Sequence, residues 1–248
     1  MSAVAIVTHC WAVNKPQYAA FLRCQLSSLV LYPPVTKVYP IVAYSKEDSH
    51  TRAVVEDFSK QGTGWLQTIE LTDGEMWRRA IARHRATQRF AASCDLMWFT
   101  DCDYLFGQGC IDSAKAAWLE ADKPEMIWPR VILANPEKSF VDKMAARQEK
   151  SPAKGLYDAT EIDVAPVKML RAIGGLQITA ATHCQQHGYL PQARWQRQPL
   201  YPFPDFRDDV AFRRRIEHRF RCVPIEPLPG LIRLRHTEVG YGVDQQNS

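Results

Sequence analysis

The chain has 248 residues, of which 46% are hydrophobic and 23% are charged, and its formal net charge is +4. This composition supplies a sizeable core and argues against a disordered chain. The length fits one large α/β domain or two small ones, and one domain with loop insertions is the simpler interpretation. The charge is too small to demonstrate a nucleic-acid partner, and no apolar stretch approaches the roughly 18 residues of a membrane-spanning helix.

The first third of the chain alternates between apolar, β-rich runs and helical patterns. The expected elements are a strand at 3–8, a helix between the N-cap Asn14 and Pro33, a strand at 38–44, a helix that buries Val54, Val55 and Phe58, and a strand at 65–71. The opening run reads as this buried strand and not as a signal peptide. The alternation predicts a parallel sheet with helices on its faces.

The rest of the chain continues the alternation with one polar interruption. The expected elements are a long helix over 73–93, a strand at 96–100, a helix over 110–121, a strand at 126–133, a helix over 209–218 and strands at 220–225 and 231–236. The polar stretch 135–160 is expected to lie outside the central sheet and is a candidate lid.

The seven cysteines have irregular spacing and include no Cys-x-x-Cys pair. This pattern indicates free thiols in a reducing cytosol and gives no sign of a zinc site. Together with the lack of a spanning segment, it predicts a cytoplasmic protein.

Two aspartates, Asp101 and Asp103, follow directly after an apolar run in the segment FTDCDYLF. Ligands of open α/β sheets bind at the carboxyl ends of the strands, so these side chains are expected in a cleft. Two carboxylates can hold a hard cation such as Mg²⁺ or Mn²⁺. Such a cation can bridge the phosphates of a nucleoside diphosphate and neutralise the charge of the leaving group.

The order of the motifs resembles that of GT-A glycosyltransferases, especially the family 2-like group, over most of the chain. The segment AIVTHCW resembles the nucleotide-binding first strand, AIARHRATQ the Ala-Arg-Asn segment, and FTDCD the metal motif. The resemblance implies an α/β, GT-A-type, Rossmann-like fold with a mostly parallel central sheet and helices on both faces. It implies one domain over 1–248, with a nucleotide-sugar-binding half at 1–107 and an acceptor-binding half at 108–248.

The same resemblance assigns residues to the donor and the metal. Asp103 is implied as the direct metal ligand, Asp101 lies closer to the ribose or the metal, and a late histidine, His236, completes the metal site. The implied donor-binding residues are Thr8, His9, Arg83, Asp101, Gly174, Gly175 and Arg235. The two glycines let the backbone approach a sugar closely, although a simple turn before a strand explains them as well.

An acidic pair is implied as the catalytic group. The segment FPDFRDDVAFRRRI resembles the acidic pair of the family, followed by a helix with basic residues. Asp209 falls at the position of the general base and Asp208 at that of an acceptor-binding residue, or the two exchange roles. A carboxylate can accept the proton as the acceptor oxygen attacks the anomeric carbon, which gives inversion. Aspartates also suit the first turn of a helix, and the two explanations are compatible.

The expected function is sugar transfer from a UDP-linked donor with Mn²⁺ or Mg²⁺. The acceptor is a glycan or a lipid-linked saccharide, or alternatively DNA with hydroxymethylated pyrimidines, as in phage-type enzymes. The alternatives to this function are a non-catalytic nucleotide-sugar-binding module and a metal-dependent phosphoryl or nucleotidyl transferase. An arginine-rich end of the chain fits an anionic partner or a solvated helix face; it comprises Arg207, Arg213, Arg214, Arg215, Arg219, Arg221, Arg233 and Arg235.

Overall fold

A seven-stranded sheet forms the centre of the computed structural model, which describes residues 3–13, 15–60, 64–135, 156–158, 162–190 and 208–234. All its strands run parallel except β9, which is antiparallel to both of its neighbours. The mostly parallel sheet predicted from the sequence is therefore confirmed. In spatial order the strands are β10 (Cys222–Ile225), β6 (Met126–Pro129), β9 (Leu176–Ala180), β4 (Leu96–Asp101), β1 (Ala3–His9), β2 (Lys37–Ser45) and β3 (Gln67–Leu71).

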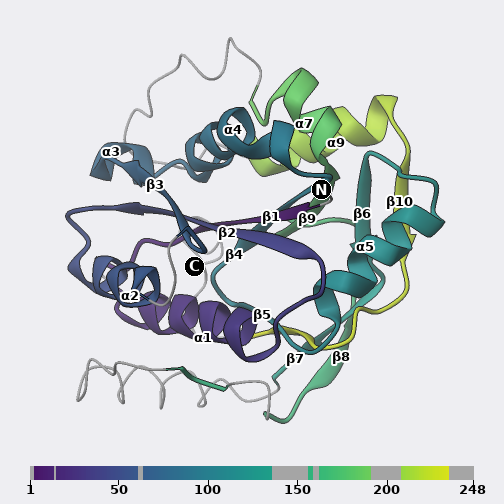
Figure 1. Ribbon diagram of the computed structural model, residues 1–248. Coiled ribbons are helices and arrows are strands. Elements are labelled where there is room, and N and C mark those ends of the chain that lie inside the picture. Colours follow the sequence, from purple (N-terminus) through teal and green to yellow (C-terminus); the bar gives the residue numbers. More distant parts are fainter. Residues whose placement is uncertain are drawn as a thin grey trace, which may run out of the picture.

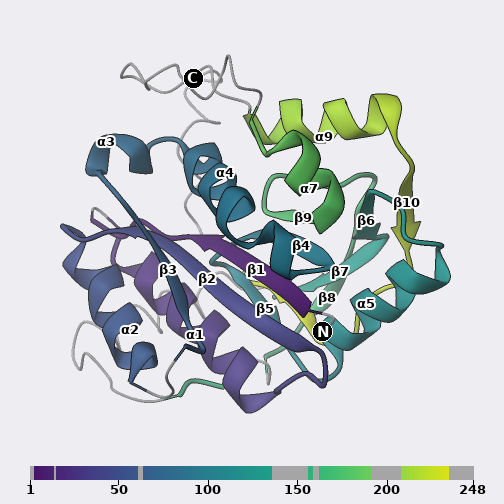
Figure 2. The same ribbon diagram turned by 45° about the horizontal axis from the view of Figure 1, so that its top comes forward.

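Helices cover both faces of this sheet, as predicted (Figure 1 and Figure 2). Val4 and Ile6 of β1 belong to the hydrophobic cluster of one face, and Ala5 and Val7 to that of the other. Strands buried on both faces need continuous apolar runs, which explains the composition of β1 and β4. The first face carries α1 (Gln17–Leu31), α2 (Ser49–Ser59) and α5 (Cys110–Glu120); the second carries α3 (Asp73–Met76), α4 (Arg79–Phe90), the short η1 (Ala91–Ser93), α7 (Ala181–His187) and α9 (Asp208–Arg219).

A second, four-stranded sheet lies under the α5 side of the first. Beside its pair of β5 and β11, two glycines approach each other closely: the N–H of Gly107, just after β5, donates to the carbonyl of Gly230, just before β11, at 2.8 Å. A Cβ on Gly107 would lie 2.9 Å from the Cα of Gly230, so neither position has room for a side chain. The strands in order are β5 (Tyr104–Phe106), β11 (Leu231–Arg233), β7 (Val131–Ala134) and β8 (Ala165–Lys168).

Two predicted elements are divided in the structure. The helix expected over 73–93 is interrupted after α3, where Arg78 has φ −123° and ψ 87°, outside the helical region. The strand expected over 126–133 is two strands, β6 and β7, which belong to different sheets. The predicted N-cap Asn14 lies outside the described residues, and α1 begins at Gln17 with Pro16 at its N-cap position.

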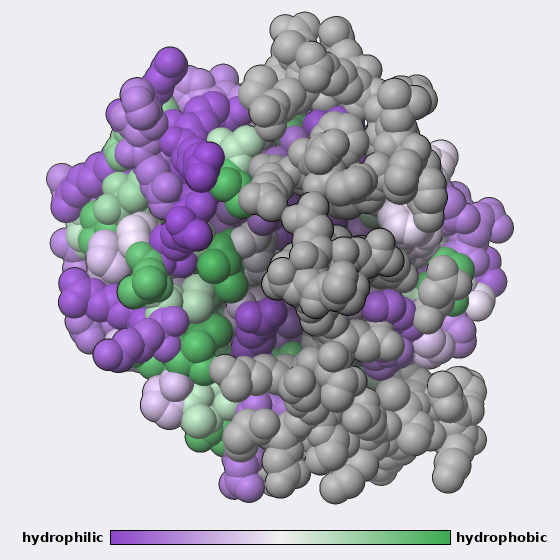
Figure 3. Space-filling model, turned by 180° about the vertical axis from the view of Figure 1, so that it is seen from behind, coloured by the Kyte–Doolittle hydropathy of each residue, from purple (hydrophilic) through white to green (hydrophobic). Residues whose placement is uncertain are grey.

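The surface mixes polar and apolar residues. Figure 3 shows the face opposite to that of Figure 1, where small groups of hydrophobic residues lie among hydrophilic ones. Val35 and Leu170 are the most exposed large hydrophobic side chains of the described residues. Among the helices of the described ranges, none combines the length and the apolar character that crossing a bilayer requires. All seven cysteines are free thiols.

Candidate active site

The candidate site lies where the carboxyl end of β4 meets the amino end of β9. In the parallel pair of β1 and β4, His9 is in register with Asp101. Because β9 is antiparallel to β4, its first residue, Leu176, is in register with Thr100 near the end of β4. The N–H of Asp101 donates to the carbonyl of Gly175 at 3.2 Å. The sheet order changes direction at β1, with β2 and β4 on its two sides, which is where ligands of open α/β sheets bind.

The glycine pair before β9 touches two carboxylates. A Cβ placed on Gly174 would lie 2.0 Å from Oδ2 of Asp209, and one on Gly175 would lie 2.6 Å from Oδ2 of Asp101. Real Cβ atoms are not found so close to another heavy atom, so both carboxylates occupy space that only glycine leaves free. The pair also forms a turn before a strand, as one of the two explanations expected.

Asp101 is the last residue of β4, and its carboxylate binds two arginines of α4. Its Oδ1 accepts from NH1 of Arg79 at 2.9 Å and from NH2 of Arg83 at 3.4 Å. Burial alone would raise the pKa of Asp101, but the charges of Arg79 and Arg83 outweigh it and hold that pKa below its ordinary value. The backbone carbonyl of Asp101 accepts from Nε2 of Gln25 in α1 at 2.9 Å. Asp101 is therefore ionised and fixed from two sides.

Asp103 begins the connection into β5 and is buried. Its Oδ2 accepts from Nε of Arg233 at 3.2 Å, and its carbonyl accepts from the N–H of Leu234 at 2.7 Å. Burial raises the pKa of Asp103 to about 6, against the lowering effect of Arg233, and the charge of Asp101 adds to the rise. The last residue of β11 and the residue after it thus hold Asp103 through both its side chain and its backbone.

A chain of hydrogen bonds joins the Asp-x-Asp turn to the acidic pair. NH1 of Arg83 donates to the hydroxyl of Tyr189 at 2.8 Å, and that hydroxyl donates to Oε1 of Gln177 at 2.9 Å. Nε2 of Gln177 donates in turn to the backbone carbonyl of Asp209 at 3.0 Å. Burial raises the pKa of Tyr189 to about 12, so its hydroxyl remains a donor near neutral pH.

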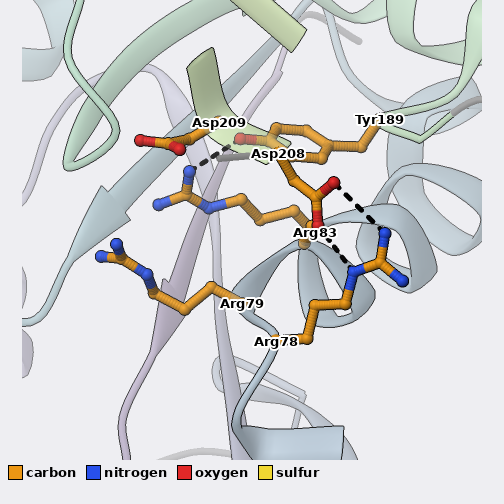
Figure 4. Close-up of a pocket in the computed structure, with 7 residues that line it drawn as sticks. Arg78, Arg79, Arg83, Tyr189, Asp208 and Asp209 are labelled. Carbon is orange, nitrogen blue, oxygen red and sulfur yellow. Dashed lines mark hydrogen bonds and ion pairs between the residues drawn. The ribbon is translucent and has the colours of Figure 1, made fainter. Parts of the chain in front are cut away.

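The two aspartates of the acidic pair have different environments. Both lie in the first turn of α9, but Asp208 is buried in an ion pair with Arg78, with Nε to Oδ2 at 2.6 Å and NH2 to Oδ1 at 3.2 Å. The Asp209 carboxylate is half-buried and accepts no hydrogen bond from the described residues. Together with Arg79 and Arg83 they line a small cavity of about 30 Å³ (Figure 4). Asp209 is therefore the member of the pair with an available carboxylate.

Thr8 and His9 lie at the end of β1. The hydroxyl of Thr8 is buried and donates to Oε1 of Gln25 at 2.6 Å, so it supports the glutamine that holds the Asp101 carbonyl. Burial, together with the nearby charges of Arg79 and Arg83, lowers the pKa of His9 to about 3. His9 is therefore neutral at physiological pH.

The charged groups of the site balance one another. A diphosphate entering a balanced site brings negative charge that only an additional cation can neutralise, and carboxylate oxygens are the ligands that Mg²⁺ and Mn²⁺ accept. Asp101 and Asp103 therefore fit a divalent cation, although no three-residue group of metal-ligating side chains occurs within the described part of the chain. His236 and Arg235, assigned to this site from the sequence, lie outside the described residues. The balanced groups are Arg78, Arg79, Arg83 and Arg233 with Asp101, Asp103, Asp208 and Asp209.

Five residues of the site were not predicted from the sequence. Arg79 precedes Arg83 by one helical turn, so the spacing could have placed both on one face of α4. Gln177 follows Gly175 by two residues, and the alternation of a strand would have put both positions on the same face of the sheet. Nothing in the sequence marks the remaining three, which are Gln25, Arg78 and Tyr189.

The sheet order, the helices on both faces and the carboxylate turn after β4 define an α/β fold of the GT-A type. Residues 1–349 of S. aureus TarS in complex with UDP share this fold, with a TM-score of 0.59 and 13% identity. The match covers 95% of this chain and 61% of that one, so the chain spans less than two thirds of the TarS length.

Weaker structural similarities accompany that match. The galactosyltransferase LgtC, with donor and acceptor sugar analogues, matches with a TM-score of 0.41 and 16% identity over 86% of this chain and 70% of its own. Mouse xyloside xylosyltransferase 1 matches with a TM-score of 0.41 and 12% identity over 94% and 84%. No protein-family model matches the chain, and no curated protein sequence matches it significantly.

Proposed function

We propose that the chain is a metal-dependent glycosyltransferase that moves a sugar from a UDP-linked donor to an acceptor hydroxyl. The observation that carries this proposal is the glycine turn, against which the carboxylates of Asp101 and Asp209 both lie. A turn without side chains lets a sugar approach its backbone between a donor-side carboxylate and a base. The UDP bound to TarS, which has the same fold, supports the donor class.

The donor is proposed to bind at the end of β1 and β4, in the half of the chain that precedes residue 108. Asp101 and Asp103 would hold Mn²⁺ or Mg²⁺, with His236 as a further ligand. When bound, the metal stabilises the negative charge that develops on the leaving diphosphate. The residues proposed around the donor are Thr8, acting through Gln25, and His9, Arg83, Gly174, Gly175 and Arg235.

Asp209 is proposed as the general base. The acceptor oxygen forms a bond to the anomeric carbon while the bond from that carbon to the diphosphate breaks, and the electron pair leaves with the diphosphate. The acceptor proton passes to the carboxylate of Asp209, and the configuration of the sugar inverts. Asp208 is assigned a positioning role, because its ion pair with Arg78 fixes the first turn of α9.

The proposed acceptor is a hydroxyl of a glycan or of a lipid-linked saccharide. The arginine-rich end offers less to DNA than its sequence suggests, because several of its side chains have partners inside the protein. NH1 of Arg213 lies 3.5 Å from Glu217, NH2 of Arg215 donates to the carbonyl of Gly188 at 2.6 Å, and Arg233 binds Asp103. Arginines engaged in this way contribute little to phosphate binding.

The test is release of nucleotide from a panel of UDP-, GDP- and dTDP-sugars, with Mn²⁺ and with EDTA. We expect release from one donor that depends on the metal and falls by more than about 100-fold in Asp103→Asn and in Asp209→Asn. Asp122→Asn is the matched control, since the side chain of Asp122 is almost fully exposed and its φ of 57° suits asparagine.

The products discriminate between the candidate functions. A nucleoside diphosphate and a free or transferred sugar support glycosyl transfer, whereas cleavage within the diphosphate identifies a phosphoryl or nucleotidyl transferase. Binding of donor without any turnover, even with glycans and hydroxymethylated DNA present, identifies a non-catalytic binding module. Failure of every nucleotide to bind in the presence of Mn²⁺ overturns the proposal.

A further inference from the structure

Three arginines of the candidate site differ in how firmly they are held. Arg78 is buried and both of its nitrogens that face Asp208 are bonded to it. Arg83 is buried as well and donates to Tyr189 and Asp101. The side chain of Arg79 is 47% exposed and its one ion pair among the described residues is with Asp101. Arg79 is therefore the arginine of the cavity that can change its partner.

Arg79 also binds one of the two proposed carboxylates and lines the same cavity as the other. It lies 2.9 Å from Oδ1 of Asp101, and the charges of Asp101 and Asp209 both raise its pKa, which keeps it a cation at every relevant pH. In Figure 4 the side chains of Arg79 and Asp209 extend in the same direction, away from the pair of Arg78 and Asp208. An exposed guanidinium at this place keeps several N–H donors available for a ligand.

A divalent cation changes the electrostatic situation of Arg79. On the same carboxylate, the metal and the guanidinium compete for negative charge and repel each other. The diphosphate that accompanies the metal supplies new oxygens, and a guanidinium binds phosphate oxygens with strong, charge-assisted hydrogen bonds. Transfer of Arg79 from the carboxylate to the diphosphate therefore relieves the repulsion and keeps the cation paired.

We propose that Arg79 is a substrate-binding residue that exchanges partners: it holds Asp101 in the free enzyme and binds the diphosphate of the donor once metal and nucleotide enter. The inference rests on the proposed function and adds to it a residue that binds the phosphates of the donor. It predicts opposite effects of one substitution on two ligands, because Arg79 competes with the metal and cooperates with the diphosphate.

The experiment measures Mn²⁺ binding by its electron paramagnetic resonance signal, and UDP binding at saturating Mn²⁺ by calorimetry. In Arg79→Gln we expect Mn²⁺ alone to bind about 3- to 10-fold more tightly, because Asp101 loses a competing cation. We expect UDP to bind about 10- to 100-fold more weakly, because charge-assisted bonds are lost. Arg79→Lys, which retains the charge but not the planar fork, is expected to lie between.

Arg89→Gln is the matched control, since Arg89 is an exposed arginine of the same helix that donates to the carbonyl of Thr68, and neither affinity should change. A purely structural role of Arg79 would weaken both ligands together, and that result overturns the inference. Unchanged UDP binding in Arg79→Gln overturns it as well. If the unmodified chain binds Mn²⁺ but no nucleoside diphosphate, the proposed function itself fails, and this inference fails with it.

Discussion

Single residues set the geometry of the candidate site, and two of them act by lacking a side chain. Gly174 and Gly175 leave the space that the carboxylates of Asp209 and Asp101 occupy. We expect Gly175→Ala to displace Asp101 and weaken Mn²⁺ and donor binding by about 10-fold or more, since an added Cβ forces the carboxylate to move. We expect Gly174→Ala to displace Asp209 and reduce turnover about 10- to 100-fold while donor affinity is retained. Calorimetry and nucleotide release separate the two.

Gly74→Ala is the control for both substitutions. A Cβ at Gly74 would meet no atom within 4 Å, so this variant should bind and react like the unmodified chain. If Gly174→Ala and Gly175→Ala lose the same property to the same extent, the two carboxylates do not have the separate roles assigned to them.

The hydroxyl of Tyr189 is the centre of the hydrogen-bond chain between Arg83 and Gln177. In Tyr189→Phe the ring keeps its stacking on Phe212, at a centroid distance of 4.1 Å, but two buried polar groups lose a partner. We expect a loss of about 1–3 kcal/mol in the free energy of unfolding, measured with urea. Tyr39→Phe is the control because the Tyr39 hydroxyl forms no hydrogen bond with the described residues, and an equal loss there would contradict the prediction.

Helices α4 and α9 are joined at their amino ends by one buried ion pair. Arg78 and Asp208 are both buried, so removal of either one takes a buried opposite charge away from the other. We expect Arg78→Met to lower the free energy of unfolding by about 3–5 kcal/mol in denaturant titrations. The double variant Arg78→Met with Asp208→Leu should recover most of that loss, since a buried pair often contributes little net stability. A double variant as unstable as the sum of the singles would show that the two residues act separately.

The sequence predicted elements well where local pattern and tertiary structure agree. The strands β1, β2, β3 and β4 and the helices α1, α5 and α9 were expected within a few residues of their observed ends, and α2 was expected by its buried residues. The break between α3 and α4 could not be predicted, because neither Pro nor Gly marks it and its cause is Arg78, whose partner is 130 residues away. The strands β5 and β8 are too short, and β8 too exposed, to leave a periodic pattern.

The site shows the same limit. Asp101 and Asp103 could be singled out because the end of a buried strand is a local feature of the sequence. The glycine pair could be singled out because two adjacent glycines are visible in the sequence itself. The pairing of β9 with β4 joins segments that are far apart in the sequence. The contact of Gly175 with Asp101 and the hydrogen bonds of Tyr189 therefore leave no local pattern in the sequence. The roles assigned to the site residues stay predictions.

At the scale of the whole molecule, buried histidines make stability depend on pH. His183 is buried against Phe220, and burial lowers its pKa to about 4, with smaller contributions from His187 and Arg215. Between pH 6.5 and 4 the unfolded chain therefore binds more protons than the folded one, and stability falls as the pH falls. The loss is at most about 3 kcal/mol for this group.

The measurement is urea unfolding at several pH values for the unmodified chain and for His183→Phe. Between pH 6.5 and 4, the free energy of unfolding of the variant should fall by up to about 3 kcal/mol less than that of the unmodified chain, because phenylalanine does not titrate. His50→Gln, at an exposed position, should keep the full dependence. Equal slopes for the unmodified chain and His183→Phe would contradict the assignment.

The position of β9 in the sheet has a consequence for the order of events during protein synthesis. β4 leaves the ribosome with the two aspartates of the turn, after its neighbour β1, but its other neighbour β9 is made about 80 residues later, and Arg233 later still. Until then the sheet lacks the strand that separates β4 from β6. The glycine pair and Asp209 have not yet been made either, so Asp101 and Asp103 lack these neighbours. The candidate site therefore forms only after residues 174–233 have been made, and a ribosome stalled before residue 174 carries a chain with the aspartate motif but without the proposed sugar site.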